Sequence, residues 1–565
     1  MSTGSDKAQA AYPQAQPETI KETLISIVIA FALAFVFRGF VVEAFVIPTG
    51  SMAPTLMGAH MRFQGRDTGY SWPVGPNSNQ VSQTDRTPTG PDLKKVMVTD
   101  PISGEVREHA SVRVQSGDRI LVLKYLYAIQ EPERFDVIVF KNPTNPQENY
   151  IKRLIGLPGE QIALVDGDVF TRPITDPAAD PGTLKSWDLP GWTIARKGQI
   201  QQQAVWQLIF DSSLAPLSFA PGSEVAKGPW EPGEPKGWEM QPRRYVHAGP
   251  ERAELTYVQT RARDAASAAA AHRRPLAWAI NDFYPYNETS IEVGQFPVGD
   301  LRARAAIVPR GAGLSAAVRF TVKSHDFEAV LAVATVNIRQ RAPQGAAGIM
   351  GDWKDVATAP FDGFTAGVAT NIEVWHQDQS VQVWVNGRLA VRFDYDWSPA
   401  QRILYATGKP LSEWMAGQTD ARNVLANPRI YETGAIKDLR WVMQGAGFEM
   451  FRVGVDRDLY YQPANFRGDT SARATNPETT LALGPDQFFV CGDNSPASLD
   501  GRLWEASDEW VVREFPAPPG GLFGDAGVVP RDLLLGRAFF VYWPSLKYEG
   551  KPTPVPDFGR MRMIW

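Results

Sequence analysis

The first part of the chain consists of a polar tail followed by one long apolar run. Residues 1–20 are mostly polar and contain two prolines, which predicts a disordered tail. From Thr23 to Phe37 the sequence TLISIVIAFALAFVF carries no charge. Arg38 interrupts this run, and apolar residues resume from Gly39 to Val42.

This apolar run predicts a helix that spans a membrane. The uncharged residues alone fall short of the roughly 20 that cross a hydrocarbon core. The stretch from Ile20 to Val42 is long enough when Lys21 and Arg38 reach the two interfaces. A cleaved signal peptide fits less well, because FRGFVVEAFVIP lacks a small-x-small site. A buried soluble helix fits less well, because nearly all faces are apolar. We therefore expect one transmembrane helix over residues 21–46, which its flanking basic residues do not orient.

Two later stretches, residues 134–143 and 149–160, have the pattern of paired β-strands, and the second ends in the turn sequence LPGE. In YIKRLIG the two-residue period of a strand puts Tyr150, Lys152 and Leu154 on one face. Burial of a lysine amine without a partner carboxylate lowers its pKa. The neutral amine can then deprotonate a serine hydroxyl. A solvent-facing lysine on an edge strand is the alternative.

A serine follows the apolar run in a proline-rich segment. In VIPTGSMAPTL, residues 46–56, Ser51 lies between Pro48 and Pro54, and Gly50 supplies one flexible joint. Such a turn can expose a hydroxyl and its own backbone N–H to a substrate carbonyl. The same sequence also fits an ordinary Gly-Ser turn, so a catalytic role is left open by this segment alone.

A third candidate segment is the polar loop that follows an apolar strand in FFVCGDNSPASLDGR, residues 488–502. Asp500 and Arg502 can pair within the loop, and Ser498 can form a hydrogen bond with a neighbouring amine. An Asx-turn loop with a surface ion pair is the alternative, and such a pair contributes little to stability.

Composition narrows the class of protein. The 565 residues are 44% hydrophobic and 21% charged, as in a globular protein of two or more domains, and 48 Gly with 45 Pro favour a β-rich fold. A net charge of −5 gives no indication of a nucleic-acid partner.

Cys491 is the only cysteine, which excludes an intrachain disulfide and a multi-cysteine metal cluster. No His/Asp/Glu spacing indicates a metal site, and we expect no cofactor. Only His60 lies near a candidate segment, and nothing pairs it with an acid.

In the same order, these segments resemble the conserved boxes of bacterial type I signal peptidases, the S26-type Ser–Lys proteases. PTGSM resembles the nucleophile box, GDRILVLKY the next strand, DVIVFKNP and NYIKRLIGLPGE the lysine box, and GDNSPASLDGR the family's polar loop. Residues 527–544 resemble the closing strands. The resemblance implies a mostly β catalytic domain formed by residues 47–170, with an irregular insertion at 57–115, and by residues 481–565.

The resemblance implies a role for each matching residue. Ser51 would be the nucleophile and Lys152 the general base, and the oxyanion would be held by the Ser51 N–H and the Thr49 hydroxyl. Ser498 matches a serine that orients the lysine amine. Support for the loop would come from Asp493, Asn494, Asp500 and Arg502, and shallow apolar pockets for small P1 and P3 side chains from Phe45, Ile47, Pro48, Val139 and Ile151.

The loop departs from the family pattern at two places. Ser495 and Pro496 stand where a basic or polar pair usually follows GDN, and Gly501 stands where a serine is common. Neither change removes a member of the dyad, but both put the hydrogen bonds that support the loop in doubt.

A long insertion, residues 171–480, separates the two catalytic parts. The unit NIEVWHQDQSVQVWVNGRLAVRF resembles a hairpin of laminin-G or concanavalin-like folds, with a turn at Asn386-Gly387. We therefore expect a jelly-roll-like β-sandwich at about 195–460. Further expected elements are strands at 319–322, 328–338, 371–375, 380–385 and 389–393, a short helix at 265–272, and, in the first insertion, a hairpin at 95–107.

The resemblance implies a membrane-bound serine endopeptidase that removes signal peptides from exported precursor proteins. It would cross the cytoplasmic (inner) membrane once, contact lipid, and carry its catalytic domain on the extracytoplasmic side. A self-cleaving Ser–Lys protease of the repressor type is disfavoured by the apolar run before Ser51. A membrane-tethered carbohydrate- or protein-binding protein with an inactive protease core remains the alternative. Whether the sandwich binds a protein, binds a glycan or acts as a spacer is left open.

Overall fold

The computed structural model describes most of the chain, and the account below concerns these residues. They are 20–36, 39, 41–65, 68–76, 93–102, 106–175, 182–215, 228–233, 237–259, 279–287, 295–344, 349–416, 418, 420–464, 472–518, 523–545, 555 and 557–565.

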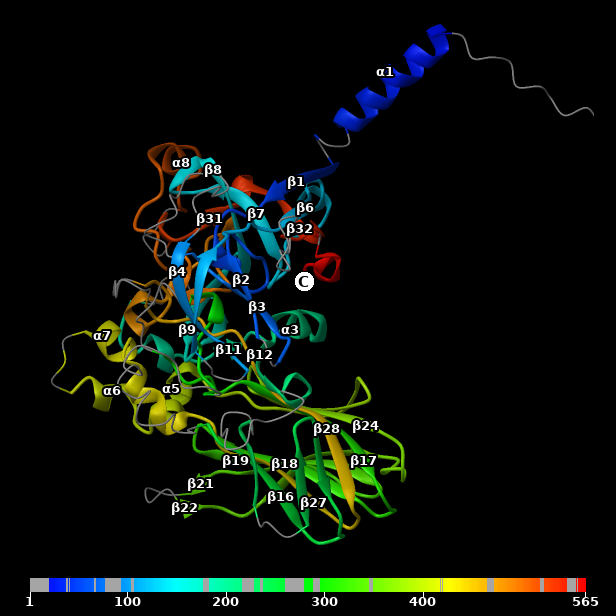
Figure 1. The fold of residues 1–565 in the computed structure, drawn as a ribbon. Helices are drawn as coiled ribbons and strands as arrows, with labels where there is room; N and C mark the ends of the chain where they lie inside the picture. The colour runs from blue at the N-terminus through cyan, green and yellow to red at the C-terminus, as the bar shows by residue number, and fades with distance from the viewer. Residues whose placement is uncertain are drawn as a thin grey trace, which may run out of the picture.

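The first described element is the helix α1 (Ile20–Val36), which extends away from the rest of the chain (Figure 1). Its apolar side chains, such as Leu24, Phe31 and Phe35, are largely exposed. Within the described part of the chain, no helix combines the length and the apolarity needed to cross a membrane. The expected transmembrane helix over residues 21–46 therefore stays a prediction. Its expected end needs correction, because residues 42–46 form the strand β1 and pair with a neighbouring strand.

Strands from both ends of the chain form one antiparallel sheet, in the order β1-β6-β32-β7-β8-β30-β31, with a last strand, β33, beside β32. The pairing joins segments that are hundreds of residues apart in the sequence. Its members are β1 (Val42–Val46), β6 (Arg119–Leu123), β7 (Val137–Asn142), β8 (Asn145–Gly156), β30 (Gln487–Cys491), β31 (Val529–Pro530), β32 (Leu534–Trp543) and β33 (Arg562–Met563).

A smaller sheet continues from β8, in the order β11-β10-β9-β29. Its strands are β9 (Glu160–Val165), β10 (Asp168–Pro173), β11 (Thr193–Ile194) and β29 (Leu481–Ala482). Ile162 and Leu164 pack with Phe489 and Cys491 of β30 in one buried cluster. This shared core fixes β8 and β30, which frame the candidate site, against the base of the insertion.

The stretch between residues 57 and 115 is more regular than expected. Besides the hairpin of β4 (Leu93–Thr99) and β5 (Val106–Val112), it contains the hairpin of β2 (Met61–Gln64) and β3 (Ser71–Val74). Met61, Phe63, Trp72 and Val74 are buried together, because they alternate with polar positions on two short paired strands. The short length of these strands hid the alternation in the sequence.

The insertion forms two antiparallel sheets that enclose one core, seen in the lower half of Figure 1. One has the order β14-β15-β28-β17-β24-β25-β26, with β12 beside β28, and the other β13-β16-β27-β18-β19-β20-β23. The first contains β12 (Gln207–Asp211), β14 (Trp238–Gln241), β15 (Arg244–His247), β17 (Leu301–Pro309), β24 (Thr370–Gln377), β25 (Ser380–Val385), β26 (Arg388–Asp394) and β28 (Phe448–Arg457). The second contains β13 (Trp230–Pro232), β16 (Ala253–Tyr257), β18 (Ser315–Val322), β19 (His325–Leu331), β20 (Thr335–Arg341), β23 (Lys354–Pro360) and β27 (Lys437–Gln444).

Alternation of buried and half-buried residues accounts for these sheets. In β17, Leu301, Ala303 and Ala305 face the core while Arg302 and Arg304 face outward. The expected strands at 371–375, 380–385 and 389–393 are confirmed as parts of β24, β25 and β26. The segment 328–338 contains parts of two strands, β19 and β20, rather than one. The expected helix at 265–272 lies outside the described residues.

Short helices accompany the sheets. They are α2 (Leu126–Ile129), α3 (Gln199–Val205), α5 (Pro399–Thr407), α6 (Leu411–Trp414), α7 (Ala421–Leu425) and α8 (Glu509–Glu514). Helix α5 begins with a Ser398–Gln401 capping box and packs against β9, so it lies between the sandwich and the smaller sheet.

Candidate active site

Ser51 lies on a single 3₁₀ turn, Gly50–Met52, a few residues after β1. The Ala53 N–H donates to the Gly50 carbonyl at 3.0 Å, and the Leu56 N–H donates to the Met52 carbonyl at 2.8 Å. Ser51 is 8% exposed, so its hydroxyl sits just below the surface. The PTGSM segment thus folds into a tight turn rather than an exposed loop, and this turn presents the serine to the neighbouring strand.

Lys152 on β8 reaches the serine. Its Nζ lies 2.9 Å from Ser51 Oγ and donates to the Ile151 carbonyl at 3.1 Å. It also lies 4.9 Å from the centroid of the Tyr150 ring, as the two-residue period of the strand predicts. The turn and the strand therefore bring the two candidate dyad residues into hydrogen-bond contact. In the general-base form of the pair, the serine hydroxyl donates to the neutral amine.

Burial favours the neutral form of the Lys152 amine. Lys152 is 4% exposed, and loss of hydration lowers the pKa of its amine to about 8. The negative charge of Asp500 acts in the opposite direction and raises the pKa, but no carboxylate forms an ion pair with the amine among the described residues. A substantial fraction of the amine is therefore neutral near pH 8, where it can accept a proton from a hydroxyl.

The two groups expected to bind an oxyanion lie on the same turn. Thr49 is exposed, and its side chain does not cap the turn that begins after it. Its hydroxyl is therefore not used to stabilise the turn. Thr49 precedes Ser51 by two residues, and with the Ser51 N–H it remains our predicted pair of oxyanion donors.

The loop from Gly492 to Arg502 is held by a buried ion pair. Both side chains of Asp500 and Arg502 are fully buried, with Nη2 and Oδ2 at 2.8 Å and Nε and Oδ1 at 2.9 Å. Asp500 also accepts from the Gly492 N–H at 2.9 Å. Arg502 donates to the carbonyl and the hydroxyl of Ser495, at 2.9 and 2.7 Å. The surface ion pair considered as an alternative is therefore excluded.

The two departures from the family pattern have structural reasons. Ser495 accepts from Arg502 and also from the Gln462 N–H at 2.8 Å, which ties the loop to the end of the insertion. A Cβ at Gly501 would lie 2.6 Å from the Gly527 carbonyl and 2.9 Å from the Phe489 ring. A serine at this position would not fit without movement of the backbone.

Ser498 does not form the contact expected of it. It is 2% exposed, yet its Oγ has no hydrogen-bond partner among the described residues, and Lys152 bonds to Ser51 and Ile151 instead. The hydroxyl lies close to Gly492, where a Cβ would meet it at 2.2 Å and the Ser51 carbonyl at 2.4 Å. Its expected role in orienting the lysine amine is not realised in this geometry.

Asp493 and Asn494 form hydrogen bonds with the two segments that carry the candidate dyad. Arg153, which follows Lys152, forms a bidentate pair with Asp493, with both N–O distances 2.7 Å and both side chains fully buried. Asp493 also accepts from the Thr55 hydroxyl. The Asn494 N–H donates to the Ser51 carbonyl at 3.1 Å, and its side-chain amide donates to the Gly50 carbonyl at 2.9 Å. Sequence analysis missed Arg153, although a charge between Ile151 and Leu154 on a buried strand is a signal for such a pair.

The expected substrate-pocket residues divide into two groups. Ile47 and Val139 are buried, and Phe45 and Ile151 pack against the same apolar cluster, which includes Met52 beside the serine. Pro48 is exposed at the entrance to the turn. Val139 and Ile151 are direct partners across β7 and β8. Apolar surface therefore adjoins the dyad on the side of β1, β7 and β8.

His60 is buried away from the dyad. Its ring nitrogens lie 2.8 Å from the Gly58 carbonyl and 3.2 Å from Ser545 Oγ. Loss of hydration lowers the pKa of the imidazole to about 4, so it is neutral at physiological pH. The ring has a structural role between β2 and the end of the chain.

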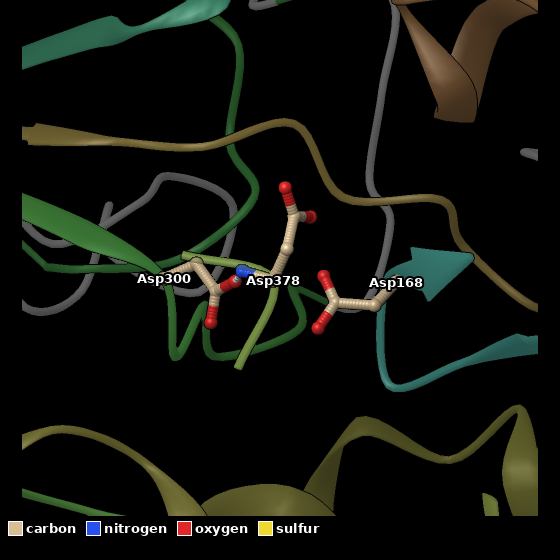
Figure 2. A group of neighbouring side chains, drawn as sticks. All are labelled: Asp168, Asp300 and Asp378. Atoms are coloured by element: carbon tan, nitrogen blue, oxygen red, sulfur yellow. Dashed lines mark hydrogen bonds between the residues drawn. The ribbon is translucent and has the colours of Figure 1, made fainter. Parts of the chain in front are cut away.

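Three carboxylates lie close together where the smaller sheet meets the sandwich. Their spacing in the sequence did not predict this cluster. Asp168 begins β10, Asp300 precedes β17 and Asp378 follows β24, and their oxygens lie within 4.8 Å of one another (Figure 2). Protein cations already contact all three, since Arg402 is 2.5 Å from Asp168 and 3.8 Å from Asp300, and Lys197 is 2.5 Å from Asp378. We assign the cluster to an ion-pair network that holds the sandwich against β10.

Comparison with protein families gives one matching model, described as signal peptidase, peptidase S26. It matches residues 20–81, 102–180 and 401–543, which together make up half of the chain. These segments contain the residues of the candidate dyad, the predicted oxyanion donors and the expected substrate-pocket residues. They also contain the loop 492–502.

Curated relatives agree with the family model. Signal peptidase I of Rickettsia typhi is 29% identical over 153 residues, 27% of this chain and 44% of that protein. Signal peptidase I of Rickettsia akari is 28% identical over 171 residues, 30% of this chain and 50% of that protein. The chain therefore spans about half the length of these relatives.

Solved structures with some similarity include the carbohydrate-binding module CBM66 of Bacillus subtilis. The match has a TM-score of 0.21 at 6% identity and covers 40% of this chain and 95% of the module. A Bacillus subtilis protein with a galectin-like fold has a TM-score of 0.23 at 9% identity over 42% of this chain and 92% of that chain. TM-scores this low assign neither a fold nor a ligand to the insertion.

Proposed function

The chain belongs to the signal peptidase family, peptidase S26, and we propose that it is a serine endopeptidase that removes N-terminal signal peptides from exported precursor proteins. The observation that carries this proposal is the 2.9 Å contact between Ser51 Oγ and a buried Lys152 amine whose pKa is lowered. The same contact disfavours an inactive protease core.

In the proposed mechanism, Ser51 Oγ attacks the scissile carbonyl while its proton passes to the neutral amine of Lys152. The Ser51 N–H and the Thr49 hydroxyl donate to the oxyanion. The resulting ammonium protonates the leaving amine, and the signal peptide remains bound to Ser51 as an ester. Lys152 then takes a proton from a water molecule, which hydrolyses the ester and restores the hydroxyl.

Membrane attachment is a further part of the proposal. Helix α1 carries no charge from Thr23 to its end, exposes its apolar side chains, and is directed away from the catalytic sheet (Figure 1). We propose that it anchors the chain in the cytoplasmic membrane together with the residues that follow it. The catalytic sheet would then lie next to the extracytoplasmic surface, where signal peptides emerge after translocation.

The substrate class is tested with a precursor that carries an Ala-x-Ala cleavage site, presented to the full chain in detergent. We expect cleavage after the second alanine, because the family resemblance implies shallow apolar pockets for small side chains, and Ile47, Val139 and Ile151 belong to the apolar cluster beside Ser51. A matched precursor with phenylalanine at P1 should be cleaved at least ~100-fold more slowly, because a large side chain does not fit a shallow pocket for a small one. Equal cleavage of both precursors would contradict the proposed specificity.

The rate of precursor cleavage should depend on pH through Lys152. Its amine has a pKa of about 8 and must be neutral to act as a base, so kcat/KM should increase roughly tenfold per unit as pH rises towards 8 and level off above it. At pH 7 only about a tenth of the amine is neutral. The measurement is a pH profile of initial rates at constant ionic strength. A profile that is flat from pH 6 to 9 would show that another group is the base.

A further inference from the structure

We propose that the segment 279–287 of the insertion acts directly on the nucleophile turn, with Asn287 as a positioning residue for Ser51. The inference rests on the proposed function of the dyad. The insertion would then contribute to catalysis. If it were only a spacer or a ligand-binding module, the dyad would be positioned correctly without the insertion. The segment ends in the short turn Pro285–Asn287, which lies against the serine turn and the loop 492–502.

Asn287 is joined to the serine turn through Asn494. The two side-chain amides form a reciprocal pair, in which Asn287 Nδ2 donates at 2.6 Å and Asn494 Nδ2 donates at 2.9 Å. The same Asn494 holds the carbonyls of both Gly50 and Ser51. Asn287 is 5% exposed and Asn494 is fully buried, so water does not readily replace the lost partner of either amide. The orientation of the Asn494 side chain, which holds the Gly50 carbonyl next to Ser51, is therefore fixed from the insertion.

Two tyrosines of the segment also pack against the serine turn and the loop 492–502. The Tyr286 ring packs so closely on Gly50 that a Cβ there would lie 2.1 Å from it, and its hydroxyl donates to the Ala59 carbonyl at 2.7 Å. The Tyr284 hydroxyl donates to the Asp493 carbonyl at 2.6 Å. Tyr284 and Tyr286 form one buried cluster with Ala53 and Met57. The residues on both sides of Ser51 thus pack against the insertion.

The segment is itself fixed to the sandwich. The Asp282 N–H donates to the Phe296 carbonyl at 2.9 Å, and Asp282 accepts from the Phe296 N–H at 2.8 Å. Arg457, at the end of β28, donates to the Phe283 carbonyl at 3.1 Å and lies 4.4 Å from the Tyr284 ring centroid. The sandwich therefore holds the segment in place against the serine turn. The turn has few hydrogen bonds of its own, so its position relative to Lys152 depends on this outside support.

The test is precursor cleavage by the full chain with Asn287→Ala, measured under single-turnover conditions, with the folded fraction measured by near-UV circular dichroism. We expect the acylation rate to fall about 10- to 100-fold, because a small displacement of a reacting group is enough for such a loss. The enzyme concentration that gives half of the maximal single-turnover rate, and the folded fraction, should stay within about twofold of the wild type, since the Ala-x-Ala site and the fold are unchanged. Asn427→Ala is the control, because this asparagine lies in the insertion outside the segment and its side chain accepts from the Arg429 N–H at 3.1 Å; its rate should stay within about twofold of the wild type.

A double variant separates positioning from a general loss of stability. In an Asn494→Ala background, Asn287→Ala should reduce the rate by less than about twofold, because its partner is already gone. The inference is overturned if Asn287→Ala cleaves at the wild-type rate, if a lower folded fraction accounts for the whole loss, or if the two substitutions have fully additive effects. A folded wild type that cleaves no precursor overturns the proposed function, and this inference with it. Cleavage by the wild type with no effect of Asn287→Ala overturns the inference alone.

Discussion

Replacing Lys152 with methionine should reduce kcat/KM for precursor cleavage by about 10²- to 10⁴-fold, the usual contribution of a general base. Methionine matches the lysine stem in length and is apolar, so the buried site on β8 should accept it. It cannot take the proton of Ser51, whose hydroxyl then stays a poor nucleophile. The loss should appear in the acylation step, with little change in KM.

Lys141→Met is the control for this substitution. Lys141 lies on the neighbouring strand β7 with its side chain exposed, and it pairs across the sheet with Asn149. Its replacement should leave the rate within about twofold of the wild type. If Lys152→Met kept a tenth or more of the activity, the base would have to be another group, and the proposed mechanism would be wrong.

The second large effect is expected on stability. Replacing Asp493 with asparagine leaves Arg153 charged and fully buried without a carboxylate partner. Breaking a buried pair in this way typically lowers the free energy of unfolding by about 3–5 kcal/mol. Arg153 keeps the Phe135 carbonyl and an oxygen of Trp565 as acceptors, and the neutral asparagine amide does not replace the charge of the Asp493 carboxylate. The measurement is the denaturant midpoint of the full chain, followed by precursor cleavage and by near-UV circular dichroism.

Glu413→Gln provides the comparison for Asp493→Asn. Glu413 pairs with Lys409 at 2.7 Å, with both side chains about half exposed. Exposed pairs of this kind contribute less than about 1 kcal/mol. A midpoint shift for Asp493→Asn no larger than that for Glu413→Gln would mean that Arg153 is not stabilised by Asp493 as the geometry indicates.

The sequence predicted the parts of the site that follow from local pattern. Alternation in YIKRLIG puts Tyr150 and Lys152 on one face of β8, and the structure has them 4.9 Å apart. The Asn386-Gly387 turn has both φ angles positive, at 49° and 77°, as its hairpin requires. The strand β1 was not predicted, because its apolar residues continue the run that begins in α1.

The parts that the sequence did not predict are contacts between distant segments. Asn287 and Asn494 are 207 residues apart, and neither lies in a periodic pattern that identifies a partner. Asp168, Asp300 and Asp378 come together only through the packing of β10 against the sandwich. Ser498 shows the converse, since the family resemblance implied a bond to Lys152 that the geometry does not contain. Tertiary packing decides these contacts, and local spacing carries no information about them.

The most direct test of the central claim compares the wild type with Ser51→Ala in cleavage of the Ala-x-Ala precursor in detergent at pH 8 or above. Ser51→Ala removes only the hydroxyl that lies 2.9 Å from the Lys152 amine, so the fold and precursor binding should be preserved. We expect cleavage at the Ala-x-Ala site by the wild type and none detectable with Ser51→Ala. Cleavage by Ser51→Ala at a rate close to that of the wild type would contradict the assignment of Ser51 and Lys152 as the catalytic dyad.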